Sequence, residues 1–214
     1  MNQARLLRRL LAGIALAASI SAGAGVYDDI LIAAQNGDNP KVIELLRRGM
    51  DVNTSDRNGD TLVMIAARSG NGELLDFLLR SRANAMKRNK YGDSPIMAAA
   101  MQGHVDAVKR LLEAGADIHQ PGWTALHYAA YAGHPKIVGL LIDRKADLDA
   151  GAPNGQTALM LAAAGGHLDA VKLLIDADAD MDLEDPDGHT ALDLAEKNGQ
   201  TDVAAYLRTE GALE

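Results

Sequence analysis

The stretch Asn154–His167, NGQTALMLAAAGGH, decides the fold because the same order of residue types returns along the chain. A glycine is followed two residues later by a threonine, then by an alanine-rich apolar run, and a second glycine comes eleven residues after the first. Further copies begin at Asn58, Tyr91, Pro121 and Asp187, and the leading glycines of the five copies lie 33, 30, 33 and 33 residues apart. An internal repeat of this length predicts a stacked array of supersecondary units.

Each copy predicts two helices joined by a tight turn. The hydroxyl residue after the leading glycine stands where a side-chain oxygen caps a helix, and Pro95 stands just inside a helix start, where its missing N–H costs nothing. Paired alanines such as Ala66-Ala67 allow neighbouring helices to approach closely. The second glycine permits the turn, and apolar residues at helical spacing follow it, as in Ile137, Val138 and Leu141. The expected capping residues are Thr61, Ser94, Thr124, Thr157 and Thr190.

The repeated segment resembles the ankyrin repeat, whose core reads G-x-T-P-L-H-x-A-A-x-x-G-H, and the resemblance extends over residues 26–214. It implies an all-α solenoid of about six helix-turn-helix units, with short finger hairpins between successive units. The first unit lacks the leading finger motif and the last is more polar, as expected of capping repeats. Within a domain of residues 25–214, we place the units at about 26–57, 58–90, 91–120, 121–153, 154–186 and 187–214.

One position of the repeat predicts unusual backbone. The family usually places a glycine directly after the second helix, as Gly49 and Gly115 do here. Arg82, Lys145 and Asp178 occupy the same place in other units. We expect left-handed backbone at these three residues, at a cost of about 1 kcal/mol each.

The first 24 residues have the layout of a secretory signal peptide. Met1–Arg9 is basic, Leu10–Ile20 is apolar and uncharged, and Ala22-Gly23-Ala24 matches an A-x-A cleavage site. We predict cleavage after Ala24 or Ala22 and export to a bacterial periplasm. The alternative is an uncleaved signal anchor, although the apolar stretch is shorter than the about 20 residues of a usual membrane span.

Composition excludes several classes of function. The chain has no cysteine, which removes disulfides, thiolate metal sites and cysteine nucleophiles. A formal net charge of −8 argues against nucleic acid or an anionic membrane as the main partner. The acidic excess lies in the second half: Val26–Gln120 holds 12 basic and 13 acidic residues, whereas Pro121–Glu214 holds 6 and 16.

No group of side chains in the sequence indicates catalysis, a metal or a cofactor. His104, His134 and His167 begin the second helices of successive units, and one unit advances the array by about 10 Å, too far for a shared zinc ion. A structural role at the turn is favoured for them. His127 occupies a position where the family's histidine hydrogen-bonds within its own repeat. The acidic run at 176–187 lacks the spacing of a calcium loop, which favours a solvated acidic finger.

The ankyrin resemblance also implies a concave binding surface, made of the finger tips and the outward side of the first helices. Exposed aromatic residues beside arginine and methionine are typical of binding hot spots. We hypothesise a hot spot of Tyr91, Met101, Trp123 and Tyr131 flanked by two basic residues, Arg68 and Lys90. The alternative for Trp123 is packing into the gap left by its shortened finger, and Tyr128 is expected in the core. The full set of candidate contact residues is Arg57, Arg68, Lys90, Tyr91, Asp93, Met101, Trp123, Tyr131 and Gln156.

These patterns together predict a monomeric, non-enzymatic interaction module or scaffold that is exported and binds a periplasmic or envelope protein through its concave face. The alternative is a membrane-anchored adaptor that keeps its N-terminal segment. An enzyme or metal protein would need a buried polar cluster that the repeat phase does not provide, and no cofactor is expected.

Overall fold

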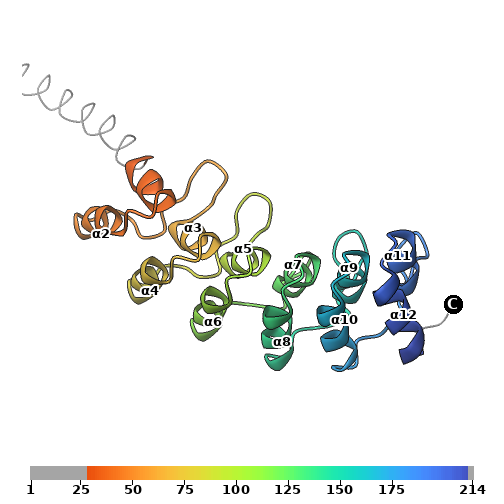
Figure 1. Cartoon of the computed structure of the whole chain (residues 1–214). Helices are drawn as coiled ribbons and strands as arrows, with labels where there is room; N and C mark the ends of the chain where they lie inside the picture. The colour runs from red at the N-terminus through yellow and green to blue at the C-terminus, as the bar shows by residue number, and fades with distance from the viewer. Residues whose placement is uncertain (1–27, 212–214) are drawn as a thin grey trace, which may run out of the picture.

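The computed structural model of the chain describes residues 28–211, so the predicted signal peptide and its cleavage site lie outside the described residues. The described part is a row of helix pairs (Figure 1). Helical residues 28–35 and α2 (Asn39–Arg47) form the first pair. The later pairs are α3 (Leu62–Arg68) with α4 (Gly72–Arg80), α5 (Pro95–Met101) with α6 (Val105–Glu113), α7 (Ala125–Tyr131) with α8 (Pro135–Asp143), α9 (Ala158–Ala164) with α10 (Leu168–Ile175), and α11 (Ala191–Lys197) with α12 (Thr201–Glu210).

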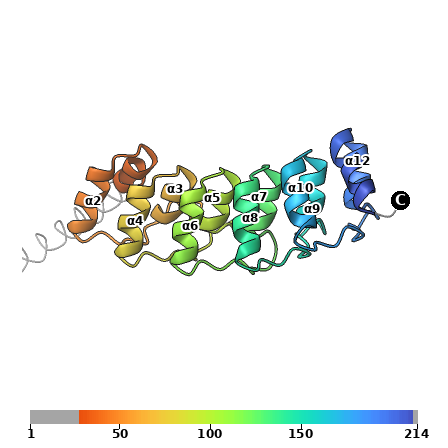
Figure 2. The ribbon, with the colours of Figure 1, turned by 60° about the horizontal axis from the view of Figure 1, so that its bottom comes forward.

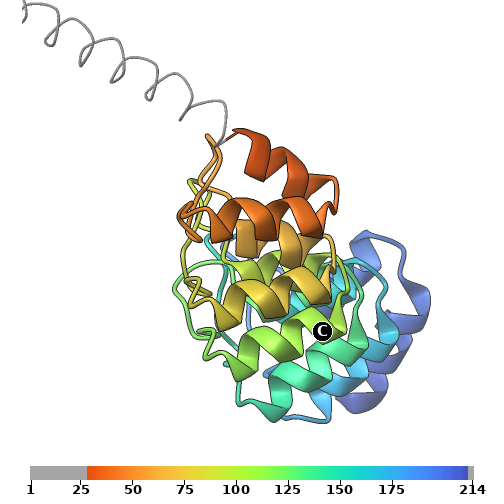
Figure 3. The same cartoon turned by 90° about the vertical axis from the view of Figure 1, so that its left-hand side faces the viewer.

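The helices form two layers. We call α3, α5, α7, α9 and α11 the inner helices, and each packs against the next along the row. The outer helices α4, α6, α8, α10 and α12 form the second layer, and the row curves so that the inner helices lie on its inner side (Figure 1). Figures 2 and 3 show the same pairs from below and from the N-terminal end. The expected all-α ankyrin solenoid is confirmed.

The inner helices begin where the repeated motif predicts. Thr61 Oγ1 accepts a hydrogen bond from the backbone N–H of Met64 at 3.2 Å, and Thr157 Oγ1 accepts one from Met160 at 3.3 Å. Each bond satisfies one of the backbone donors that a helix leaves free at its first turn. The threonine of the motif therefore caps these helices, whereas Ser94, in the same position before α5, forms no hydrogen bond through its hydroxyl group.

Alanine pairs bring the inner helices close together. Ala66 and Ala67 have no exposed surface, and the same holds for the equivalent pair Ala129 and Ala130. Because the alanine methyl group is small, the backbones of neighbouring helices lie close together. A larger side chain would not fit between them and would force the helices apart, at a cost of about 1–3 kcal/mol. The core is consequently one continuous apolar strip that runs along the row.

The outer helices end in the left-handed backbone that the sequence predicts. The φ angles of Arg82, Lys145 and Asp178 are 62°, 63° and 66°. Gly49 and Gly115, at the equivalent place in other units, have φ angles of 96° and 83°. The turn after the outer helix thus requires positive φ whichever residue stands there.

The fingers are short, compact turns. Between residues 28 and 211 no β-strand forms, and an isolated antiparallel bridge joins Ser55 and Thr61. A backbone hydrogen bond closes the finger between Asp56 N and Asp60 O at 3.0 Å, and the equivalent bond of the last finger joins Asp185 N and His189 O at 3.0 Å. A closed segment of five residues leaves too little chain for a strand ladder.

No helix in the described part of the chain is both long and apolar enough to cross a membrane.

Replacing Lys145 by glycine tests the cost of the left-handed turn. We expect Lys145→Gly to raise the free energy of unfolding by up to about 1 kcal/mol, because glycine removes the Cβ clash at positive φ. Urea unfolding followed by circular dichroism measures the change. The matched control is Arg144→Gly, one residue earlier at φ −91°, which has no clash to relieve and should lose stability. Equal losses in both variants would contradict the account.

Candidate functional site

The predicted contact residues lie either in the fingers or at the ends of inner helices. Arg68, Met101 and Tyr131 are the last residues of α3, α5 and α7, so they occupy the same position in three successive repeats. Tyr131 is 55% exposed, and Tyr91 at the tip of the finger before α5 is 75% exposed. The structure therefore places both tyrosines where a partner could reach them.

The first two finger tips lie side by side. The backbone N–H of Lys90 donates a hydrogen bond to Asn58 O at 2.9 Å, which joins the finger before α5 to the finger before α3. Arg57 and Lys90 are both exposed. Among the described residues neither forms an ion pair. We call these two residues the tip cations.

Trp123 packs against two neighbouring rings. Its ring lies 5.5 Å from the ring of Tyr128, tilted by 33°, and 5.8 Å from the ring of His127 in an edge-on arrangement. The side chain is half-buried. These ring contacts support the packing interpretation for Trp123. The role of Trp123 as a partner contact stays a prediction.

Gln156 belongs to the finger before α9, two repeats along from the finger of Lys90. It is half-buried, and its Oε1 accepts a hydrogen bond from Asn154 Nδ2 at 2.9 Å. The side-chain oxygen of Gln156 is therefore engaged within its own finger, and its role as a partner contact stays a prediction.

A polar network joins three repeats under the concave surface. Arg68 forms an ion pair with Asp60, with its guanidinium nitrogen 2.6 Å from Oδ2, and Asn89 Nδ2 donates to Asp60 Oδ1 at 2.8 Å. Tyr128 OH donates to Asp93 Oδ1 at 2.7 Å. Asn89 Nδ2 also lies 3.4 Å from Asp93 Oδ2. The network links the finger and inner helix of the second unit to α7 of the fourth.

The network fixes the protonation of its members. Burial by itself raises the pKa of Asp60, but hydrogen bonds from Arg68 and Asn89 outweigh it and hold that pKa below its usual value. Burial, assisted by the hydrogen bond to the Asp93 carboxylate, raises the pKa of Tyr128. At neutral pH Asp60 is therefore a charged acceptor and Tyr128 is a neutral donor. The Asp93 carboxylate already accepts hydrogen bonds within the protein, which leaves it less available to a partner than the sequence suggests.

Sequence reasoning assigned Tyr128 to the core, whereas the structure places it half-buried at the concave face. The available signal was its hydroxyl group, because a buried tyrosine hydroxyl needs a hydrogen-bond partner. The partner, Asp93, lies 35 residues earlier, and the repeat pattern alone does not identify it.

A shallow pocket, here called the central pocket, opens between α3, α5 and α7. Its floor is apolar, with Met97 and Ala98 only 2% and 9% exposed. One wall is formed by the polar network and another by Met101. The lining residues are Arg68, Asp93, Met97, Ala98, Met101, Gln102 and Tyr128.

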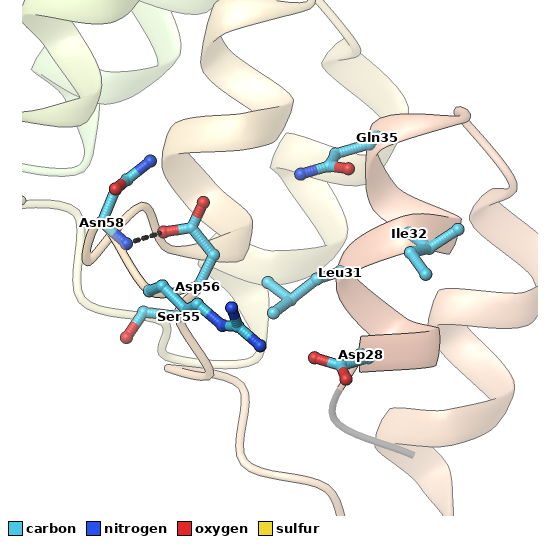
Figure 4. A pocket seen from close by; sticks show the side chains of 8 residues that line it. Asp28, Leu31, Ile32, Gln35, Ser55, Asp56 and Asn58 are labelled. Atoms are coloured by element: carbon cyan, nitrogen blue, oxygen red, sulfur yellow. Dashed lines mark hydrogen bonds between the residues drawn. The ribbon is translucent and has the colours of Figure 1, made fainter. Parts of the chain in front are cut away.

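A second pocket, here called the N-terminal pocket, lies between the helix of residues 28–35 and the first finger (Figure 4). Ile32 in its lining is 52% exposed. Sequence reasoning missed this pocket, although the run Ile30-Leu31-Ile32 places one more apolar residue than a buried helix face needs. The lining residues are Asp28, Leu31, Ile32, Gln35, Ser55, Asp56, Arg57 and Asn58.

Three histidines join neighbouring repeats, which confirms a structural role at the turn. The Nε2 atoms of His104, His134 and His167 lie 3.1, 3.2 and 3.0 Å from carbonyl oxygens in the preceding repeat. Those carbonyls belong to the candidate contact residues Arg68, Met101 and Tyr131, in that order. Each histidine thereby helps to position the end of an inner helix that faces the groove.

The turn glycine leaves the space that each of these rings fills. Gly103 has a φ angle of 75°, and a Cβ built on it would lie 2.7 Å from Cε1 of His134. Any larger residue at this glycine would therefore collide with the ring as well as adopt a disfavoured backbone.

His127 is buried, and both of its ring nitrogens form hydrogen bonds. The ankyrin resemblance implies the bond within its own repeat. Nδ1 lies 2.7 Å from Thr124 Oγ1 within the repeat, and Nε2 lies 2.8 Å from Ala150 O in the following finger. Burial lowers the pKa of His127, because a charged imidazolium loses its hydration there. The side chain is fully engaged in the fold.

The last finger gathers three residues that resemble a metal site. Oxygen and nitrogen atoms of Asp185, Asp187 and His189 lie within 4.8 Å of one another. Asp185 Oδ1, however, accepts hydrogen bonds from the backbone N–H groups of Asp187 and His189, both at 3.0 Å. Asp56 Oδ1 makes the same pair of bonds in the first finger. The turn of the finger therefore accounts for the grouping.

The buried His127 predicts a loss of stability in mild acid. Its folded-state pKa is depressed, so its contribution is complete above the usual value of about 6.5 and declines as pH falls below it. We expect His127→Met to reduce this decline, because Met64, Met97 and Met160 occupy the same position in other repeats. Chemical unfolding at pH 7 and pH 5 measures the difference. The control His119→Gln, in an exposed loop, should leave the decline unchanged; an unaltered decline in His127→Met would contradict the account.

Comparison with known proteins identifies the family to which the chain belongs. The family model for ankyrin repeats, in three copies, matches residues 30–121, 82–152 and 126–213. Protein phosphatase 1 regulatory subunit 27 of Mus musculus and that of Homo sapiens are each 49% identical to this chain over 51 residues. The shared segment is 22% of this chain and 33% of each relative, so the chain spans about a third of the length of these curated relatives. With the family match extending over nearly all the described residues, the chain belongs to the ankyrin-repeat family.

Proposed function

We propose that this protein is a non-enzymatic scaffold that holds a protein partner in its concave groove. Ankyrin repeats are protein–protein interaction modules, which supports binding as the activity. The observation that carries the proposal is the exposure of Tyr91 and Tyr131 on the same side of the row, 75% and 55% respectively. Exposed aromatic side chains on a rigid surface are the usual anchors of protein interfaces.

Two buried polar side chains, His127 and Asp60, are occupied within the fold, which supports a binding role over catalysis. His127 uses both ring nitrogens, and Asp60 uses both carboxylate oxygens, in bonds that hold the fold together. A general base needs a free acceptor within reach of a substrate proton, and these two groups have none to offer.

The relatives support the same class of function. By its name, protein phosphatase 1 regulatory subunit 27 regulates a phosphatase. Regulation through a bound subunit is an interaction function, and this agrees with a scaffold. The match covers 51 residues of a repeat that occurs in proteins with different partners. It therefore supports binding as the class of function and does not identify a phosphatase as the partner.

We further propose that the protein is exported to a bacterial periplasm and that its partner is a periplasmic or envelope protein. The support is the basic, apolar and A-x-A layout of residues 1–24. The second candidate is a membrane-anchored adaptor that keeps this segment, favoured by the same apolar stretch.

N-terminal sequencing of the protein purified from a periplasmic fraction separates these two possibilities. Export with cleavage predicts a first residue of Gly25 or Gly23. An intact Met1 in the membrane fraction would support the anchored adaptor, and an intact Met1 in the cytosol would contradict both.

Capture of the partner tests the scaffold. The chain without residues 1–24 is immobilised, incubated with periplasmic extract, and the captured protein is identified by mass spectrometry and then purified. Tyr91→Ala combined with Tyr131→Ala should weaken its binding at least about tenfold, since anchor residues of interfaces contribute of order 2 kcal/mol each. Thermal unfolding of the variant should be unchanged, because both side chains are exposed.

The matched control is Tyr206→Ala on the outer helix α12, where the ring lies under the Lys172 ammonium. We expect this variant to bind the captured partner normally. Normal binding by the double variant, or equal losses in both, would contradict a concave binding site.

A further inference from the structure

Basic residues are concentrated in the sequence just before and within the second finger. The segment of residues 81–90, which leads into the second finger, has four basic residues and no acidic one. Both tip cations project from adjacent fingers, and Arg57 also lines the N-terminal pocket. The opposite end differs, because the last finger carries Glu184 and Asp187, both exposed.

The carboxylates near these cations are largely occupied. Asp60 is 7% exposed and is bonded to Arg68 and Asn89. Asp56 accepts two backbone N–H groups of its own finger. Asp28 is the exposed acid in the lining of the N-terminal pocket. The charged side chains that are exposed on the two finger tips, Arg57 and Lys90, are therefore both cationic.

Each pocket combines an apolar surface with an arginine. The lining of the N-terminal pocket includes Arg57 and the apolar side chains of Leu31 and Ile32, and Ile32 is 52% exposed. In the central pocket Met101 lies beside Arg68. An apolar surface next to an arginine suits an apolar partner residue that has an acidic neighbour. The apolar side chain of the partner is removed from water in the pocket, while the carboxylate stays at the rim near the arginine.

We propose that the N-terminal half of the groove binds an acidic segment of the partner protein, with apolar side chains of that segment in the N-terminal and central pockets. Carboxylates of the segment lie over the tip cations. This inference rests on the proposed function and narrows it to one chemical class of partner. It also extends the binding surface to the first repeat, beyond the central region that the sequence predicts.

Selection of peptides tests the proposal without knowledge of the partner. A library of random peptides displayed on phage is selected against the immobilised chain lacking residues 1–24. The expected result is enrichment of peptides with net negative charge and at least one large apolar residue. Enrichment of basic or uncharged peptides, or no enrichment, would overturn the proposal.

Charge reversal locates the site of the selected peptides. Arg57→Glu with Lys90→Glu should weaken binding at least about tenfold and reduce its dependence on salt. The matched control is Lys109→Glu with Lys136→Glu on the outer helices α6 and α8, where both lysines are exposed. This control makes the same change in net charge and should alter binding less than about twofold.

Removal of the apolar contact tests the pocket. Ile32→Ser should weaken peptide binding about tenfold, which is the expected loss for one buried aliphatic side chain. Met86→Ser is the control, because Met86 is 55% exposed in the loop after α4 and lines neither pocket. Equal binding by both variants would contradict the role of the N-terminal pocket.

Two further outcomes separate this inference from the function on which it rests. A captured protein partner that depends on Tyr91 and Tyr131 but binds normally to the charge-reversed tips leaves the scaffold intact and overturns the acidic segment. A mixed-sequence oligonucleotide that binds as tightly as the selected peptides, and loses binding in the same variants, would assign the cations to nucleic acid and overturn the proposal.

Discussion

Close contact between neighbouring inner helices is the constraint on which the whole structure depends. Ala66, Ala67, Ala129 and Ala130 have no exposed surface, so each helix pair buries its apolar face only by stacking on the next. Such an array has no central core, and its stability comes from the units and the interfaces between them. Because the units stack regularly, equivalent residues of successive units lie next to one another along the concave side. Their side chains together form a continuous surface.

Hydrogen bonds between repeats hold that surface in place. The histidine that begins an outer helix contacts the carbonyl group at the end of the preceding inner helix, and this carbonyl belongs to a candidate contact residue such as Met101 or Tyr131. Beneath the fingers, Asn89 joins Asp60 to Asp93. Pre-organisation of this kind lowers the entropy cost of binding, because few groups must be ordered when the partner arrives. The hydrogen bonds that stabilise the fold therefore also hold the groove in the shape in which it binds.

The repeat spacing predicts the fold almost completely, since period, helix starts and turns follow from local residue types. Even the strained backbone at Arg82, Lys145 and Asp178 follows from the absence of glycine at a known position. The site is predicted less well, because it depends on contacts between residues about 35 positions apart. The repeat phase identifies Tyr131 as exposed, but it does not reveal that Tyr128 donates to Asp93. Nor does it reveal the pocket lined by Ile32, which lies between the helix of residues 28–35 and the first finger.

In the proposed complex, the partner occupies the concave groove and touches the fingers and inner helices but not the outer layer. Hydrogen–deuterium exchange of the protein, free and bound to its captured partner, tests this most directly. We expect slower exchange at the finger tips around Arg57 and Lys90 and at the ends of α5 and α7, with unchanged exchange in α6, α8 and α10. Protection confined to the outer helices would contradict it.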